Sequence, residues 1–234
     1  MSDCSRTVED VRTLLQSRKG LNPQQMAKFF DNWAETYDQD VKTLNYREPN
    51  LAVDFLNANF PGSREEAQVL DIACGSGLVA KLMVELGFKH FVGVDCSNSM
   101  LELAAKTGLY QDLKLAILGP EPLPTQTGAF DVVIIAGALR DGSVPVSVIR
   151  ELWQAAKPGG YICMSRVDTA SESDKSYKVS VEKELQLMEE EGLWTPVDTK
   201  EMDKYFIDPF NNYEKEQNAH YLSGTMYLYR KSLN

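Results

Sequence analysis

The chain is poor in the features that build a metal site, a disulfide framework or a membrane span. Its 234 residues include four cysteines and two histidines, and no two cysteines form a CxxC pair. Zinc sites need closely spaced Cys and His ligands, so we expect no metal and packed, reduced thiols. No run approaches the ~20 apolar residues of a membrane-spanning helix. The N-terminus has neither the charged nor the apolar region of a secretory signal. We therefore expect an intracellular protein, in the cytoplasm, the nucleus or both.

Positive charge is also scarce. Lys and Arg number 24 against 34 Asp and Glu, which gives a net charge of −10, and no run of basic residues occurs. Because proteins dedicated to nucleic acids usually present a basic face, we expect no nucleic-acid partner. The 43% hydrophobic content is ordinary for a globular protein. We expect residues 1–234 to form one domain, active as a monomer.

The most informative segment present is Val69–Ala80, which reads VLDIACGSGLVA. An apolar run ends in Asp71, a loop of small residues follows, and an apolar helical pattern then begins. The two glycines of the loop allow a tight turn and let a ligand lie against peptide N–H groups. A second apolar run ends in Asp95, eighteen residues beyond Gly77. A carboxylate there can accept both hydroxyls of a ribose, so the spacing predicts a nucleoside-cofactor pocket.

Around this segment, strands and helices alternate. Continuous apolar runs such as Val132–Ile135 suit strands that are buried on both faces. Strands separated by helices imply a parallel, doubly wound sheet. We predict strands at 68–73, 90–95, 112–118, 130–136 and 160–167, helices at 78–86, 98–107 and 145–157, and a turn at Lys157–Gly160.

The flanking segments follow other patterns. Residues 1–62 predict a helical cap, with helices at 6–19, from Pro23 onward and at about 49–59. After residue 170 we predict a helix at 174–191, then two extended segments at 194–206 and 220–230 that pair antiparallel at the sheet edge. The expected architecture is an α/β, Rossmann-like, doubly wound and mostly parallel sheet over 68–167, with antiparallel C-terminal strands within 168–234.

The loop alone does not identify the nucleoside. Gly75–Ala80 fits the dinucleotide fingerprint G-x-G-x-x-[GA]. However, Asp71 would repel a pyrophosphate on this loop, whereas it would suit the ammonium of S-adenosylmethionine, directly or through loop amides and water. Asp95 suits either cofactor, since both contain a ribose. The residues favour S-adenosylmethionine. An NAD(P)-dependent oxidoreductase and a non-catalytic S-adenosylmethionine-binding regulator or partner protein are the alternatives.

Several segments resemble the motifs of class I S-adenosylmethionine-dependent methyltransferases. The first family motif is matched by LDIACGSG, the second by VGVDCSNSMLELA, the fourth-strand motif by FDVVIIAG, and the helix-to-strand segment by LWQAAKPGGYICMS. Upstream, FFDNWAETYDQDV resembles the helix that folds over the cofactor in many small-molecule methyltransferases. The resemblance implies methyl transfer from S-adenosylmethionine, with S-adenosylhomocysteine as product, to a small molecule or a protein side chain.

Carried over by position, the resemblance also implies cofactor contacts. The glycine loop would pass under the methionine part, Asp95 would hold the ribose, and Met100 would pack against adenine. The full set is Trp33, Tyr37 and Tyr46 from the cap, Asp71, Ala73, Gly75, Ser76 and Gly77 around the loop, Asp95, Cys96 and Met100 after the second strand, Gly119, and Ala136, Gly137 and Ala138 after the fourth strand.

The chain departs from common family features in two places. Many relatives have an Asp after the third strand that accepts the adenine amino group, but Leu118–Pro124 contains none, so Glu121 or a backbone carbonyl would have to substitute. The [DNS]-P-P-[YFW] motif of amino-nitrogen methyltransferases is replaced by Ala136–Leu139. A fragment of it at Asp208–Phe210 lies in the wrong place and predicts a loop turn.

No general base is evident from the sequence. The better-placed histidine, His220, opens a C-terminal strand but is more simply a surface or packed residue, and His90 lies at the wrong end of its strand. Arg140–Gly142 predicts a polar turn, with a contact to the substrate as the alternative. The catalytic residues therefore stay unassigned at this point.

Overall fold

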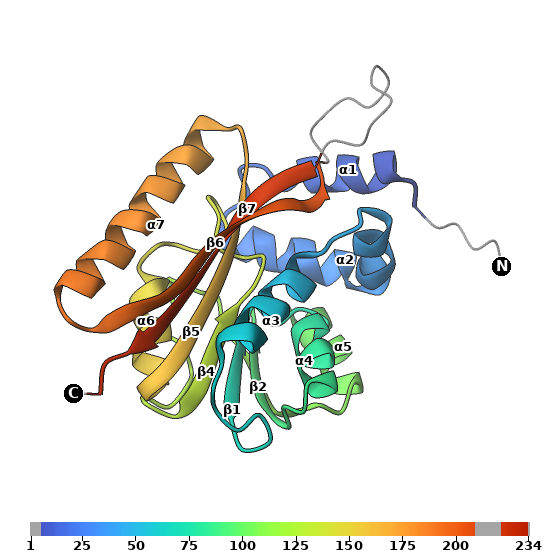
Figure 1. The fold of residues 1–234 in the computed structure, drawn as a ribbon. Helices are drawn as coiled ribbons and strands as arrows, with labels where there is room; N and C mark the ends of the chain where they lie inside the picture. Colours follow the sequence, from blue (N-terminus) through green and yellow to red (C-terminus); the bar gives the residue numbers. More distant parts are fainter. Residues whose placement is uncertain (1–5, 209–220, 234) are drawn as a thin grey trace.

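A sheet of seven strands forms the centre of the computed structural model, which describes residues 6–208 and 221–233. The strand order is β3-β2-β1-β4-β5-β7-β6 (Figure 1). The first five strands pair in parallel, and β7 runs antiparallel to both β5 and β6. Their bounds are β1 (Gln68–Ile72), β2 (His90–Asp95), β3 (Tyr110–Leu115), β4 (Phe130–Ile135), β5 (Ala156–Asp168), β6 (Trp194–Ile207) and β7 (Tyr221–Lys231). The predicted fold class is confirmed.

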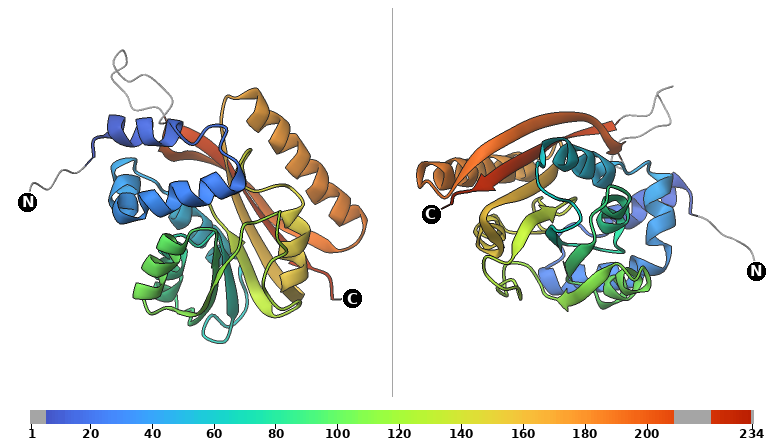
Figure 2. Two further views of the ribbon diagram at one scale, coloured as in Figure 1. Left: turned by 180° about the vertical axis from the view of Figure 1, so that it is seen from behind. Right: turned by 60° about the horizontal axis from the view of Figure 1, so that its bottom comes forward.

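Two helix layers cover the sheet, and alternate residues of the central strands face them. Leu70 and Val133 point into the cluster formed with α6 (Val148–Ala155) and α7 (Glu172–Glu190). Val69 and Val132 point into the cluster formed with α3 (Glu48–Asn59) and α4 (Leu78–Glu85). Figure 2 shows the sheet between these layers. Burial on both faces explains the continuous apolar run Val132–Ile135 of the central strand β4.

The N-terminal helices lie apart from these layers, across the end of the sheet. They are α1 (Val8–Gln16) and α2 (Pro23–Thr43), and they share a small core of their own that includes Val11 and Trp33. Asn22 caps α2 by accepting the Gln25 N–H, with Pro23 in the first turn, as the sequence predicts. The fifth helix in chain order, α5 (Asn98–Lys106), connects β2 to β3 and contacts α2.

Some predicted boundaries differ from the structure for local reasons. The predicted turn at Lys157–Gly160 lies inside β5 as a bulge, because Phe130 pairs with Ala156 while Val132 pairs with Tyr161. The C-terminal helix starts two residues earlier than predicted, since the Ser171 hydroxyl accepts the Asp174 N–H and caps it.

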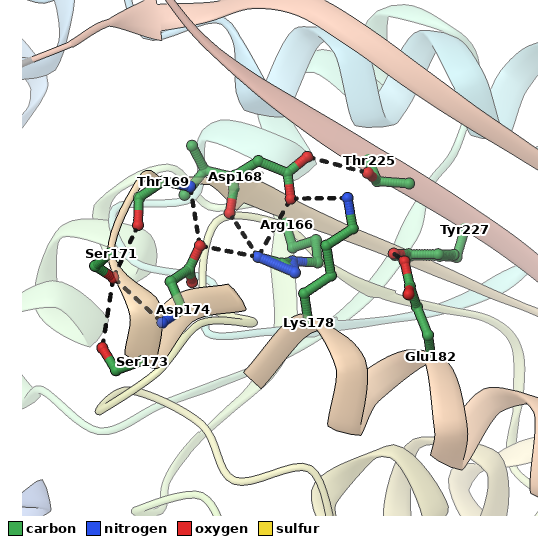
Figure 3. A network of polar contacts seen from close by, with 11 residues as sticks. Arg166, Asp168, Thr169, Ser171, Ser173, Asp174, Lys178, Glu182, Thr225 and Tyr227 are labelled. Carbon is green, nitrogen blue, oxygen red and sulfur yellow. Dashed lines mark hydrogen bonds and ion pairs between the residues drawn. The ribbon is translucent and has the colours of Figure 1, made fainter. Parts of the chain in front are cut away.

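A buried charge network fastens α7 to β5 (Figure 3). The fully buried Arg166 donates to the Asp174 carboxylate at 3.1 Å and lies 3.3 Å from that of Asp168. Asp174 also accepts the Thr169 N–H at 2.9 Å. Removing one partner of such a network would leave a buried charge uncompensated, so it fixes where α7 begins. None of these residues lines the cavity described below.

In the part of the chain that the structure describes, no helix is long and apolar enough to cross a membrane. Within the same residues no cluster of three His, Cys, Asp or Glu side chains could hold a metal ion, and Cys74, Cys96 and Cys163 are free thiols. His220, and Pro209 and Phe210 of the predicted loop turn, lie outside the described residues.

Candidate functional site

A cavity lies where β1, β2 and β4 end, under α1 and α2. The space between its walls, the open mouth included, is about 1150 Å³. The strand order reverses direction between β1 and β4. Open α/β sheets bind ligands beside the carboxyl ends of strands at such a reversal, so the cavity has the position expected of a binding site.

Most of the predicted cofactor residues line this cavity. They come from the cap, the glycine loop, the end of β2 and the segment after β4, which are far apart in the sequence. The predicted residues found in the lining are Trp33, Tyr37, Tyr46, Ala73, Gly75, Asp95, Cys96, Met100, Ala136, Gly137 and Ala138.

Asp95 joins the end of β2 to the glycine loop. Its Oδ2 accepts the Gly75 N–H at 2.8 Å and its Oδ1 accepts the Ser97 N–H at 2.9 Å. Burial raises the pKa of Asp95, and these backbone N–H groups oppose that rise. A carboxylate has acceptor sites beyond these two bonds, so Asp95 retains the capacity to accept ribose hydroxyls.

The space around the glycine loop also fits a cofactor. Gly75 has a φ of +54°, in the left-handed region that favours glycine, and a Cβ added there would meet no atom within 4 Å. The loop backbone is therefore open to a ligand on its cavity side. Beside it, burial raises the pKa of the Cys96 thiol to about 12, so Cys96 is a neutral wall residue rather than a nucleophile.

Asp71, predicted as a cofactor residue, lies outside the cavity lining. It is buried behind the loop, where its Oδ2 accepts the Tyr110 hydroxyl at 2.7 Å, and it does not line the cavity. Gly77 lies beside the same tyrosine and serves as the left-handed residue before α4. A direct bond from Asp71 to a cofactor ammonium does not fit this position. An interaction of Asp71 with the cofactor ammonium through the loop amides and water stays a prediction.

Ser76 and Gly119 also lie outside the cavity lining. The Ser76 hydroxyl donates to Asp38 of α2, so its side chain fastens the cap to the loop. Gly119 has a φ of +98°, and a Cβ there would lie 2.2 Å from Pro145. This packing by itself explains the glycine, and a cofactor contact stays a prediction.

The helix α2 forms one wall of the cavity. Trp33 and Tyr37 line it, with ring centroids 4.8 Å apart. The Trp33 indole donates to the buried Asp40 at 2.8 Å, which fixes the ring. From the same helix, Asp31 accepts the Ser97 hydroxyl at 2.7 Å, and so ties α2 to the start of α5. The expected aromatic cover is therefore built from α2.

Sequence reasoning missed Glu48, which lies on the β4 side of the cavity. Its Oε1 accepts the Ser165 hydroxyl at 2.7 Å and the Gly137 N–H at 3.0 Å, and its Oε2 accepts the Tyr46 hydroxyl at 3.3 Å. Burial raises the pKa of Glu48. Gly137 has a φ of +81°, and a Cβ there would lie 2.2 Å from the Tyr46 hydroxyl oxygen. Tyr46 thus packs directly on the segment after β4.

Two arginines complete the charged lining. Arg18 follows α1 and Arg140 follows β4, in the segment that the sequence predicts as a polar turn. Burial lowers the pKa of both guanidinium groups, and each stays charged at neutral pH. The location of Arg140 at the ligand-binding end of a parallel strand was the one signal that could have marked it. Nothing in the sequence distinguishes Arg18 from a surface arginine.

Comparison of this chain with known sequences identifies the protein family that it matches. Residues 63–216 match a family described as "Methyltransferase domain". Human "Methyltransferase-like protein 27" is 45% identical over 189 residues, which cover 80% of this chain and 76% of that protein. A "Ubiquinone biosynthesis O-methyltransferase" of Albidiferax ferrireducens is 28% identical over 176 residues, covering 71% of this chain and 66% of that protein.

Solved structures share the fold at low sequence identity. The [4+2]-cyclase SpnF superposes with a TM-score of 0.66 at 16% identity, covering 91% of this chain and 97% of that one. A Thermotoga maritima S-adenosylmethionine-dependent methyltransferase is described as a possible histamine N-methyltransferase. It superposes with a TM-score of 0.53 at 19% identity, covering 87% of this chain and 98% of that one. At these identities the likeness concerns the fold alone. The matched family and the human relative decide the assignment: the chain belongs to the class I S-adenosylmethionine-dependent methyltransferases.

Proposed function

We propose that the enzyme binds S-adenosylmethionine between the glycine loop and α2 and transfers its methyl group to a small molecule held on the β4 side of the same cavity. The observation that carries this proposal is the lining of a single cavity by Asp95 and Gly75 at one side and by Tyr46, Glu48 and Arg140 at the other. Family membership implies use of S-adenosylmethionine and an acceptor.

The chain's own residues would orient the cofactor and the acceptor and exclude water from them. Bound S-adenosylmethionine supplies a methyl group already activated by its positive sulfur. Asp95 would hold the ribose, and Met100 with Ile117 and Leu118 offers an apolar slot for adenine. Trp33 and Tyr37 would exclude water from the reacting end. Orientation of two bound reactants can supply ~7–11 kcal/mol of barrier lowering. A base is required only for an acceptor that must lose a proton.

A small acceptor fits this arrangement better than a protein side chain. The α1 and α2 helices cover the cavity, so an acceptor must fit beneath them or displace them. The relatives named as ubiquinone biosynthesis O-methyltransferases support an oxygen atom of a small molecule as the methylated position. Monomeric state, an intracellular location and the lack of a nucleic-acid partner stay predictions, the last supported by the net charge of −10.

Transfer of label tests the proposal directly. Purified enzyme is incubated with S-adenosylmethionine labelled in the methyl group and with a small-molecule fraction and a protein fraction of cell extract. We expect labelled product in the small-molecule fraction, absent with Asp95→Ala. Label confined to protein would overturn the acceptor class. Tight binding of S-adenosylhomocysteine without transfer to either fraction would favour a cofactor-binding protein without catalysis.

A further inference from the structure

The two arginines in the cavity form no direct polar contact through their guanidinium groups within the described residues. Neither the Arg18 nor the Arg140 guanidinium forms a hydrogen bond or an ion pair with any described side chain, although both line one partly enclosed cavity. By contrast, Arg166 is ion-paired with Asp168 and Asp174. Both arginines are half-buried. Removing a charge from water without an ion-pair partner is costly, so two such guanidinium groups in one cavity point to an anionic ligand.

The nearby carboxylates do not fill that role. Among the described residues, the charged side chains that line the cavity are Arg18, Arg140, Glu48 and Asp95. Glu48 accepts bonds from Ser165, Gly137 and Tyr46, and Asp95 accepts N–H groups of the glycine loop. The charge of Arg140 lowers the pKa of Glu48, against the rise that burial causes. Even so, neither acid lies within 4.0 Å of a guanidinium nitrogen of either arginine.

The cofactor does not supply enough negative charge either. S-adenosylmethionine carries a sulfonium, an ammonium and one carboxylate, so its net charge is positive. Its one carboxylate is outnumbered by these two positive groups. Since two arginines and two carboxylates line the cavity, adding the cofactor leaves an excess of positive charge there. A second, negatively charged ligand would balance it.

The remaining walls describe the body of that ligand. Beside the arginines, the cavity is lined by side chains of α2 and of the loop after Arg140 that are apolar, including Met26, Phe30 and Val144. An arginine fork matches the geometry of a carboxylate or a phosphate, and these walls match an apolar group attached to it.

Resting on the proposed function, we propose that the methyl acceptor is an organic acid with an apolar body, whose oxyanion is bound by Arg18 and Arg140. The negative group balances the charge of the bound cofactor, and the apolar body lies against α2. The two arginines are binding residues, which select the acceptor class.

Matched charged and neutral probes test the acceptor class. Benzoate and phenyl phosphate are compared with benzamide by calorimetry on protein saturated with sinefungin, a cofactor analogue that keeps a positive charge in place of the sulfonium. We expect at least one of the two acids to bind at least tenfold more tightly than the amide, and Arg18→Gln and Arg140→Gln each to reduce that preference tenfold or more. Lys19→Gln, which removes an exposed charge next to Arg18, is the matched control and should keep the preference. No preference for either acid, or a preference that survives both variants, would overturn the proposal.

A second arm separates the acceptor from the cofactor's own carboxylate. The affinities of S-adenosylhomocysteine and 5′-methylthioadenosine, which lacks the amino-acid part, are measured for each variant. If the arginines served only the cofactor, both variants would weaken the first compound and spare the second, and wild type would show no preference for the acids. Failure of wild type to bind S-adenosylhomocysteine would instead contradict the proposed function. In that case, the preference for the acids over the amide is measured on protein without a bound cofactor, so that the acceptor proposal is still tested.

Discussion

At Asp95, one carboxylate both holds the glycine loop and faces the cavity. Asp95→Asn keeps the shape but removes the charge, so we expect S-adenosylhomocysteine to bind about 10- to 100-fold more weakly, since a hydrogen bond to a charged group contributes ~1.5–3 kcal/mol. Isothermal calorimetry measures this loss.

Asp112→Asn is the matched control for that variant. Asp112 lies on the neighbouring strand β3, is exposed, and pairs with Lys114 at 2.8 Å, away from the cavity. Its substitution should leave the affinity within about twofold, because an exposed ion pair contributes little. Equal affinity for wild type and Asp95→Asn would show that the ribose is held elsewhere.

Asp71 gives a prediction of pH dependence. Burial raises its pKa to about 7, against the Tyr110 hydrogen bond that lowers it. The folded protein holds this proton more tightly than the unfolded chain does. The contribution of Asp71 to the free energy of unfolding therefore falls as pH rises from about 4 to about 7, by ~4 kcal/mol at most. Above about pH 7 this contribution no longer changes. In Asp71→Asn this contribution disappears, so the variant should gain stability relative to wild type as pH rises.

Urea denaturation at pH 5 and pH 8 measures that difference between the two proteins. The other carboxylates titrate in both proteins and cancel in the comparison. A gap between variant and wild type that is the same at both pH values would contradict a raised pKa at Asp71.

At the scale of elements, α2 is the part expected to respond to the cofactor. Its aromatic side chains line the cavity, and Asp31 and Asp38 tie it to α5 and to the glycine loop. Because a bound cofactor adds contacts to this wall, we predict slower amide exchange in Pro23–Thr43 when S-adenosylhomocysteine is present. Helix α7 lines no part of the cavity and should exchange equally in both states. Equal exchange of α2 with and without ligand would count against its role as a cover.

The strands and helices were largely predictable from the sequence, because their signals are local. Apolar runs marked β1, β2 and β4, and Asn22 with Pro23 marked the start of α2. On the charged side of the cavity, only the position of Arg140 after β4 gave a signal in the sequence. Arg18, Glu48 and Arg140 meet only through the tertiary fold, and Glu48 sits in a helix whose other buried residues look like ordinary core. The orientation of Asp71 likewise depends on Tyr110, a partner 39 residues away.

At the scale of the whole molecule, the function depends on which nucleoside the cavity binds. The glycine loop fits a dinucleotide pattern, yet the chain belongs to a methyltransferase family. The two cofactors share adenosine and differ in what lies beyond it, so a comparison of the two on the same protein isolates that difference.

The most direct measurement is therefore the melting temperature with S-adenosylhomocysteine and, separately, with NAD⁺. A ligand at 100 times its Kd stabilises the folded state by ~2.7 kcal/mol. For a chain of this size that corresponds to a rise of about 5–10 °C. We predict this rise with S-adenosylhomocysteine and none with NAD⁺. A rise with NAD⁺ alone, or no rise with either compound, would contradict S-adenosylmethionine as the cofactor of this protein.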